Sequence, residues 1–307
     1  MKYGQGKINT AEIFYNISFS RRVINFLATI LVTTSLLIAI IPLFWVLYSV
    51  ITRGWRMLRS PDWFTCSQFG MTTFIYGGGA YHAIVGTLIQ GLICLILSIP
   101  ISVMVGIYLV EYGSRTYLGK TTNFMVDILT GVPSIVISLF IYILWVDTFG
   151  LNRSGFAVSL ALVLLMIPAI IRATEEMLQI IPIDLREASY ALGIPKWKTI
   201  SHVLIPTAIS GIVSGTILAL ARIMGETAPL LMCVGYSQVN NTNMFSGFMG
   251  SLPGLMYDQI STGAGVNLIP TDRLWGAALT LILLISLLNI SNRFITNFFL
   301  REYKLNG

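Results

Sequence analysis

Long runs of apolar residues alternate with short polar segments along most of this chain. Six stretches contain no charged side chain for 18 residues or more, and each is rich in Ile, Leu and Val. A helix needs about 20 apolar residues to cross a bilayer, and backbone groups in lipid must be bonded within the segment. The pattern therefore predicts an all-α integral membrane protein with six transmembrane helices, at about 24–51, 84–110, 126–147, 154–174, 205–235 and 275–297.

The composition supports this class and excludes several others. Hydrophobic residues make up 55% of the chain and charged residues only 10%, whereas an ordinary soluble domain is about 25% charged. A globular protein with so few charged residues would not have a surface polar enough to keep it in solution. Soluble enzymes, disordered proteins and nucleic-acid-binding domains are therefore excluded, and membrane lipid is the expected surrounding. The first apolar run is also too long for a signal peptide.

The lysine and arginine residues predict the orientation of the six spans. Thirteen of the 19 lie on the side that holds both termini, and five lie on the other side. Cytoplasmic segments carry the excess of positive charge, so both termini are expected in the cytoplasm. The expected organisation is a cytoplasmic N-terminal segment (1–23), a six-span transmembrane domain (24–297) containing a cytoplasmic loop (173–203), and a cytoplasmic tail (298–307).

Three classes of function remain for such a protein: an intramembrane enzyme, a self-powered channel or carrier, and the membrane part of a complex powered by another chain. Only two histidines are present, His82 and His202, and they lie at span ends without an H-E-x-x-H motif. The three cysteines are too scattered for a metal site. We therefore expect no catalytic residue and no metal ligand. An ion-driven carrier usually buries several ionisable groups, yet charge in the middle of the spans is confined to Arg222 and Glu226.

The chain also lacks a convincing nucleotide site. The run from Gly193 to Thr199 begins like a P-loop, but Trp197 stands where a second glycine must let backbone amides reach phosphate. We expect this chain to bind no cofactor. ATP and Mg²⁺, if they power the protein, would be bound by a partner chain.

The cytoplasmic loop at 173–203 is predicted to form two short amphipathic segments. Asp184 stands where an N-cap residue would precede a helix at about 185–192. Gly193 permits a left-handed helix stop, and Pro195 follows it. This helix either lies on lipid headgroups or docks on a partner. Its apolar stripe, at helical spacing, consists of Leu185, Ala188, Ser189 and Leu192.

The same loop resembles the EAA motif of ABC-importer permeases, which reads E-A-A, three residues, G, nine residues, then I-x-L-P. The chain has Glu187-Ala188-Ser189, three residues, Gly193, nine residues, then Val203-Leu204-Ile205-Pro206, with small departures at Ser189, Val203 and Ile205. In that family the loop is a short helix that docks into a groove of the ATPase. The resemblance therefore implies that ATPase coupling involves Glu187, Ala188, Ser189, Gly193 and Pro195.

Further segments are similar to the permeases of phosphate-specific ABC importers, which are type I (MetI-like) permeases. The matching segments are YLVEYG (108–113), GVPSIVISLF (131–140), IIRATEEML (170–178), LREASYALGIPKWKTIS (185–201) and ALARIMGETAPLL (219–231). The resemblance implies a bacterial cytoplasmic (inner) membrane protein that transports inorganic phosphate by alternating access. Its implied partners are a second homologous permease, two ATPase subunits and a periplasmic or extracellular phosphate-binding protein. Residues 1–20 and the outer loop 236–274 match nothing specific.

Phosphate is an anion with strong acceptor oxygens, so a path across the membrane must offer hydrogen-bond donors. Arginine suits this task because its planar fork is always charged and binds oxyanions bidentately. Arg222 lies 16 residues after Pro206, or about 24 Å along a helix, and Arg172 ends the fourth span. Residues expected along the path are Arg222, Arg172, Glu226, Thr227 and Ser134.

Each of these residues also has a structural interpretation. Arg222 and Glu226, four residues apart on a helix, would form an ion pair. Arg172 would extend towards the headgroups from a helix end, and Ser134 would pack between helices. Thr227 is expected to disturb the helix just past Glu226. The alternatives for the function are a permease for another oxyanion or small solute, and a passive channel or secondary carrier.

Overall fold

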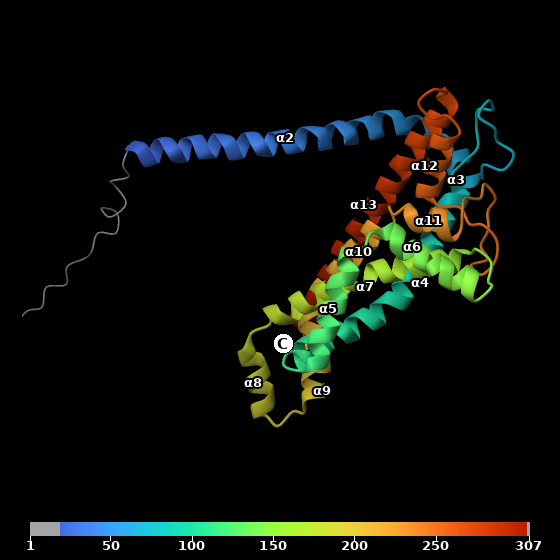
Figure 1. The fold of residues 1–307 in the computed structure, drawn as a ribbon. Coiled ribbons are helices and arrows are strands. Elements are labelled where there is room, and N and C mark those ends of the chain that lie inside the picture. Colours follow the sequence, from blue (N-terminus) through green and yellow to red (C-terminus); the bar gives the residue numbers. More distant parts are fainter. Residues whose placement is uncertain (1–18, 306–307) are drawn as a thin grey trace, which may run out of the picture. The chain divides into compact units, whose positions relative to one another are not determined.

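The computed structural model describes residues 19–305, which form helices joined by loops (Figure 1). The predicted N-terminal segment lies outside the described residues up to position 18, as do Asn306 and Gly307. The chain divides into two units, Met1–Ile51 and Thr52–Gly307. The helices are α2 (Phe19–Leu58), α3 (Asp62–Thr65), α4 (Tyr81–Ile107), α5 (Tyr117–Gly131), α6 (Ser134–Tyr142), α7 (Gly155–Ile180), α8 (Ile183–Ala191), α9 (Lys196–Thr199), α10 (Ile205–Ile223), α11 (Ala228–Cys233), α12 (Leu252–Ser261) and α13 (Leu268–Leu305).

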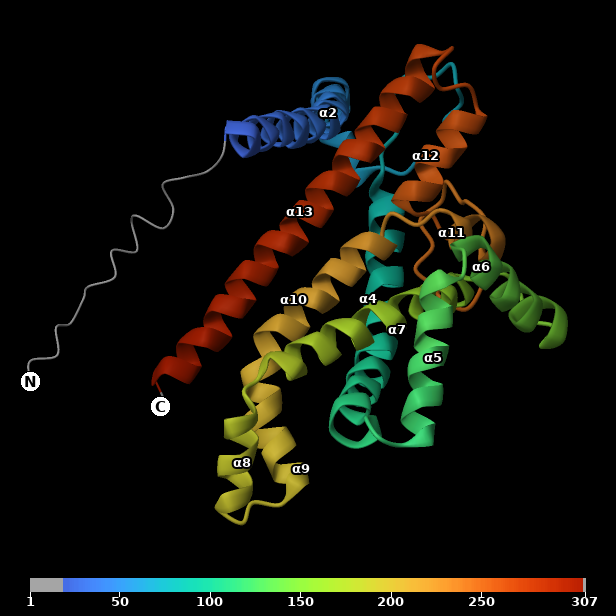
Figure 2. The same cartoon turned by 60° about the vertical axis from the view of Figure 1, so that its left-hand side comes forward.

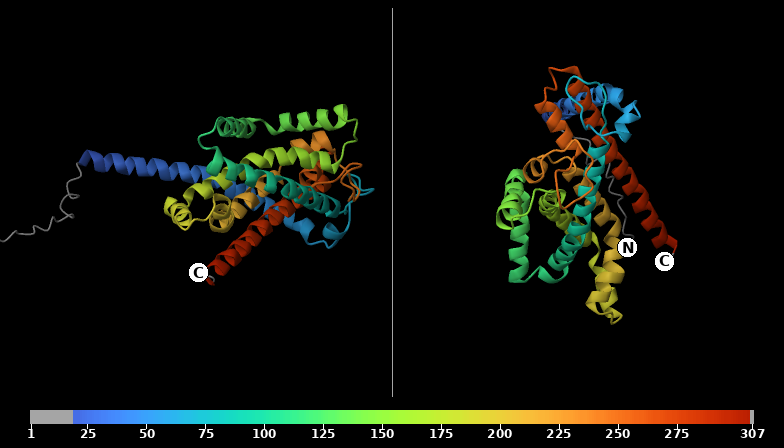
Figure 3. Two further views of the ribbon diagram at one scale, coloured as in Figure 1. Left: turned by 90° about the horizontal axis from the view of Figure 1, so that it is seen from below. Right: turned by 90° about the vertical axis from the view of Figure 1, so that its right-hand side faces the viewer.

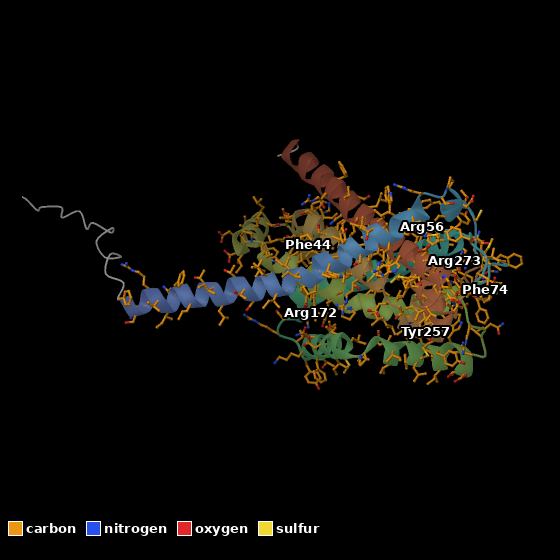
Figure 4. The ribbon with its side chains drawn as sticks, turned by 90° about the horizontal axis from the view of Figure 1, so that it is seen from above. Phe44, Arg56, Phe74, Arg172, Tyr257 and Arg273 are labelled. Atoms are coloured by element: carbon orange, nitrogen blue, oxygen red, sulfur yellow. The ribbon has the colours of Figure 1, made fainter. Side chains whose placement is uncertain are left out.

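The first unit, as far as it is described, is the larger part of α2. Its most apolar 18-residue window has a mean hydropathy of 2.5, and none of that window is buried. Large side chains such as Phe44 (labelled in Figure 4) and Trp45 are exposed. A helix that is apolar on all sides and exposed is suited to lipid rather than water. This helix confirms the first predicted span and extends it at both ends.

The core of the second unit is built around α7. Met166 and Ile170 of α7 are fully buried and pack in one cluster with Cys94 of α4 and Leu220 of α10. Figure 2 shows α10 between α13 and α7. The neighbouring helices therefore shield α7 from lipid. The apolar side chains on the outer faces of those helices are the ones that lipid contacts.

The third predicted span, 126–147, is broken rather than continuous. Helix α5 ends at Gly131 and α6 begins at Ser134, and the two helices are bent by 102°. The cause lies in Val132 and Pro133: the residue before a proline is pushed out of the helical region, and Val132 has φ −74° and ψ 129°. Both views in Figure 3 place α5 and α6 at the edge of the helix bundle, beside α7.

The fifth predicted span, 205–235, is also interrupted. Its helix ends at Ile223, and α11 begins at Ala228 with Pro229 in its first turn. Residues 224–227 lie between the two helices, so the helix ends before Glu226 and not after it. With the bent α5–α6 pair counted as one span, the described residues contain six candidate membrane spans. The chain is thus a multi-pass membrane protein.

Two helices continue into segments that the sequence placed outside the membrane spans. The first amphipathic segment of the loop 173–203 is not separate, because α7 continues to Ile180. The tail predicted at 298–307 is helical as far as Leu305, since α13 continues through it. Helices α7 and α13 therefore both extend beyond the apolar stretch of their spans.

The loops at the α3–α12 end pack on the helices. Trp63 of α3 is fully buried and donates a hydrogen bond from Nε1 to Oγ1 of Thr280, at 2.9 Å. Arg273 is 2% exposed and donates hydrogen bonds to the backbone carbonyls of Thr72, Ile75 and Gly77. Figure 4 shows Arg273 close to Arg56 and Phe74, away from Arg172.

Candidate functional site

A cavity of about 390 Å³ lies where the two broken spans meet α7. Its walls come from the break between α5 and α6, the middle of α7 and the end of α10. The lining residues are Leu129, Thr130, Val132, Pro133, Ser134, Leu165, Pro168, Ala169, Arg172, Arg222, Ile223 and Glu226. Four of the five residues predicted for a substrate path therefore line one cavity. The fifth, Thr227, adjoins Glu226 but is not among the lining residues.

Arg172 is held by acidic and amide side chains. It forms ion pairs with Asp127 of α5 and with Glu175, whose Oε2 lies 2.6 Å from Nη1. The same nitrogen donates to Oδ1 of Asn123 at 2.8 Å. Two carboxylates thus compensate the charge of Arg172 and tie α7 to α5. Asp127 and Asn123 were not predicted as part of the site, because the sequence does not show which helix packs against α7.

Arg222 has a different environment. Its side chain is exposed in the last turn of α10, and it makes no hydrogen bond or ion pair within residues 19–305. The ion pair expected with Glu226 is not formed, because the helix that would align the two residues ends at Ile223. The cavity therefore contains one arginine that is paired with carboxylates and one that is free to bind an anion.

Ser134 and Ser138 lie on the same helix, α6, but have different environments. Ser134 is the first residue of α6 and borders the cavity. Ser138 is fully buried, and its Oγ donates to the carbonyl of Ser134 at 2.6 Å. The carbonyl of Ser138 accepts a hydrogen bond from Sγ of Cys233. Only Ser134 is thus placed to contact a solute.

The predicted coupling segment is a hairpin of α8 and α9. Gly193 has φ +74°, and the amides of Gly193 and Ile194 donate to the carbonyls of Tyr190 and Ser189. This is the Schellman pattern of a left-handed helix stop, as the sequence predicted. Asp184 is not the N-cap, because α8 begins at Ile183 after Pro182 and Asp184 lies within its first turn.

The hairpin presents most of its predicted coupling residues to solvent. Glu187, Ala188, Gly193 and Pro195 are exposed. Ser189 instead faces α9, where its Oγ lies 2.8 Å from Oγ1 of Thr199. Large apolar side chains are also exposed on the hairpin, namely Ile183, Leu185, Leu192 and Trp197. The hairpin therefore exposes an apolar surface.

Glu111, which the sequence did not single out, fastens this hairpin to α4. It lies in the π-helical turn η1 (Tyr108–Gly113) that ends this span. Its Oε1 lies 3.1 Å from Nε of Arg186, and its backbone carbonyl accepts a hydrogen bond from Lys196. Arg186 also donates to the carbonyls of Leu178 and Ile181. Two signals pointed to Glu111, namely an acidic residue at the end of an apolar run and its place in the matching segment YLVEYG.

Comparison with known proteins identifies the class. The model of the family described as "Binding-protein-dependent transport system inner membrane component" matches residues 98–304, and the chain belongs to this family. Its fold is that of the MetI-like permeases. A chain of the MetNI methionine ABC transporter, in inward-facing conformations, superposes with a TM-score of 0.56 at 20% identity, covering 72% of this chain and 94% of that one.

Two relatives are more similar to this chain in sequence than the MetNI chain is. The chain is 48% identical, over 91% of both proteins, to the phosphate transport system permease protein PstA of Mycobacterium leprae. It is 40% identical to the phosphate transport system permease protein PstA of Yersinia pestis, over 73% of this chain and 75% of that one. The chain is thus a permease subunit of an ABC transporter.

Proposed function

We propose that this chain is one of two homologous permease subunits of an ATP-driven importer for inorganic phosphate. The observation that carries the proposal is the unpaired Arg222, which lines a cavity together with Arg172, Glu226 and Ser134. A free guanidinium offers two parallel donors to an oxyanion. The similarity to permeases named for phosphate transport supports phosphate as that oxyanion.

Energy is supplied by partner ATPase subunits, which bind ATP and Mg²⁺, and this chain itself performs no hydrolysis. The exposed apolar side chains of α8 and α9 provide a surface for such a partner. The hairpin lies on the cytoplasmic side of the bacterial inner membrane together with both termini, as the excess of lysine and arginine there favours. A phosphate-binding protein delivers the solute from outside, and alternating access releases it into the cytoplasm.

Uptake by the whole complex tests this proposal. The chain is co-expressed with a homologous permease, an ATPase and a phosphate-binding protein, and the purified complex is reconstituted in liposomes. We expect ATP-dependent accumulation of radiolabelled phosphate that excess unlabelled phosphate suppresses and sulfate does not. Suppression by sulfate indicates a permease for another oxyanion. Accumulation down a gradient without ATP indicates a passive channel, and dependence on an ion gradient indicates a secondary carrier.

A further inference from the structure

A second, much smaller pocket shares two lining residues, Ile223 and Glu226, with the cavity. It has a volume of about 10 Å³ and lies between α4, the break after α10 and the start of α12. Glu226 lines both spaces, and the polar residues Thr87, Gln90 and Ser251 line only the small one. A volume of this size holds about one water molecule. The small pocket therefore shares Ile223 and Glu226 with the candidate substrate path and adds polar groups next to it.

Gln90 is the residue of this pocket whose hydrogen bonding is incomplete. Its side chain is 3% exposed, and Nε2 is buried without a hydrogen-bond partner. The other two polar side chains are used: Oγ1 of Thr87 donates to the carbonyl of Ala83 and accepts from the amide of Leu252, while Oγ of Ser251 accepts from the amide of Gly254. An unpaired buried donor destabilises a fold, and this one lines a pocket, so an acceptor oxygen that entered the pocket would satisfy it.

The backbone packing fixes Gln90 against the end of α10. The next residue, Gly91, faces α10, where a Cβ at its position would lie 3.5 Å from Leu220. One helical turn before Gln90, a Cβ on Gly86 would lie 2.0 Å from the carbonyl oxygen of Gly250. Helix α4 is thus in close contact both with α10 and with the segment that leads into α12. A relative movement of these elements changes the width of the pocket that Gln90 lines.

We propose that Gln90 is a further residue of the phosphate path, where its amide donates a hydrogen bond to a phosphate oxygen beyond Glu226. This inference rests on the proposed function. Glu226 repels an approaching anion, and a donor beside it offsets that repulsion. Because the amide is neutral, it adds a hydrogen bond without a second full charge, and a transported ion must bind weakly enough to leave. The pocket in its present size excludes phosphate and so closes the path at this point.

Replacement by leucine tests the role. Gln90→Leu keeps a similar size but removes the donor, and we expect the maximal rate of phosphate uptake in proteoliposomes to fall about tenfold or more, as for a lost hydrogen bond to a charged group. The thermal midpoint of the complex stays the same or rises, because an unpaired buried amide has been removed. A residue that only stabilised the fold would lower uptake and thermal midpoint together.

A matched control lies on the same helix. Ser102 is also fully buried with an unpaired side-chain oxygen, but it lines neither space. Ser102→Ala should therefore retain wild-type uptake. Should Gln90→Leu fail to assemble, Gln90→Met removes the same donor with an unbranched side chain. Wild-type uptake by an assembled Leu or Met variant overturns the role of Gln90.

The wild-type complex and Arg222→Gln are measured in the same experiment. If the wild type accumulates no phosphate, the proposed function is wrong and the inference falls with it. If the wild type transports phosphate, Arg222→Gln does not, and Gln90→Leu transports at the wild-type rate, then only the inference about Gln90 is wrong.

Discussion

Glu111 and Arg186 form an ion pair between the end of α4 and helix α8, segments that lie 75 residues apart in the sequence. The Glu111 side chain is 6% exposed and the Arg186 side chain 15% exposed. Arg186 also bonds to two carbonyls near the end of α7. One arginine therefore connects the exposed hairpin to two membrane spans.

We expect Glu111→Gln to uncouple the transporter. Removing one partner of a buried ion pair leaves an uncompensated charge, at a cost of about 3 kcal/mol, and loosens the hairpin from α4. The assembled complex should still hydrolyse ATP, but phosphate uptake per ATP hydrolysed should fall. The control is Arg115→Gln, which changes an exposed residue close by. Unchanged coupling in Glu111→Gln would show that the ion pair transmits no motion.

Gly193 should tolerate only residues that accept a left-handed conformation. No heavy atom lies within 4 Å of a Cβ built on Gly193, so the restriction comes from its φ of +74° and not from space. A Cβ costs about 1 kcal/mol there. Coupled uptake should decrease in the order Gly193→Asn, Gly193→Ala, Gly193→Val. Equal uptake in all three variants contradicts a requirement for this helix stop.

Substitution of Glu226 should not restore the uptake that is lost when Arg222 is substituted. Arg222→Gln should abolish uptake while the complex still assembles, and Arg222→Lys should retain part of the rate, because a point charge replaces the bidentate fork. Since the structure contains no ion pair between them, adding Glu226→Gln to Arg222→Gln should not restore uptake. Restored uptake in the double variant would instead favour a structural pair.

The two arginines of the cavity should differ in their effect on stability. Arg172→Gln leaves Asp127 and Glu175 without their cation, so the thermal midpoint of the complex should decrease. Arg222→Gln removes no such contact and should leave the midpoint unchanged. Scanning calorimetry of both purified complexes checks this, and an equal decrease in both would contradict the difference in pairing.

The orientation can be tested with reporter fusions. A reporter active only in the cytoplasm should be active after Asn306, and one active only outside should be active within 236–274. Activity of the outside reporter at the C-terminus would contradict both the six-span topology and the cytoplasmic location of the hairpin.

The sequence predicted the spans well because their signal is length and apolarity. It also predicted the left-handed stop at Gly193, since glycine is the residue that adopts this conformation without strain. It did not reveal the break at Val132–Pro133. It predicted a disturbance of the fifth span just past Glu226, whereas the helix already ends at Ile223. Proline is tolerated inside other helices of this chain, at Pro100 and Pro168, so its presence alone does not distinguish a break.

The site was only partly predictable for a related reason. Arg172, Arg222, Glu226 and Ser134 were identified from local motifs, and all four line the cavity. The partners of Arg172 on α5 were not identified, because Asp127 and Asn123 contribute through the packing of helices distant in sequence. A single sequence contains the residues of such contacts but not their pairing.

Both interruptions, in α5–α6 and after α10, border the cavity. A helix bends most easily where its hydrogen-bond ladder is broken, so a rotation of one end of the bundle against the other would pivot at these two points. In such a rotation, atoms near the pivot points move least and atoms far from them move most. A solute bound there would keep its contacts while the access routes above and below it open and close in turn.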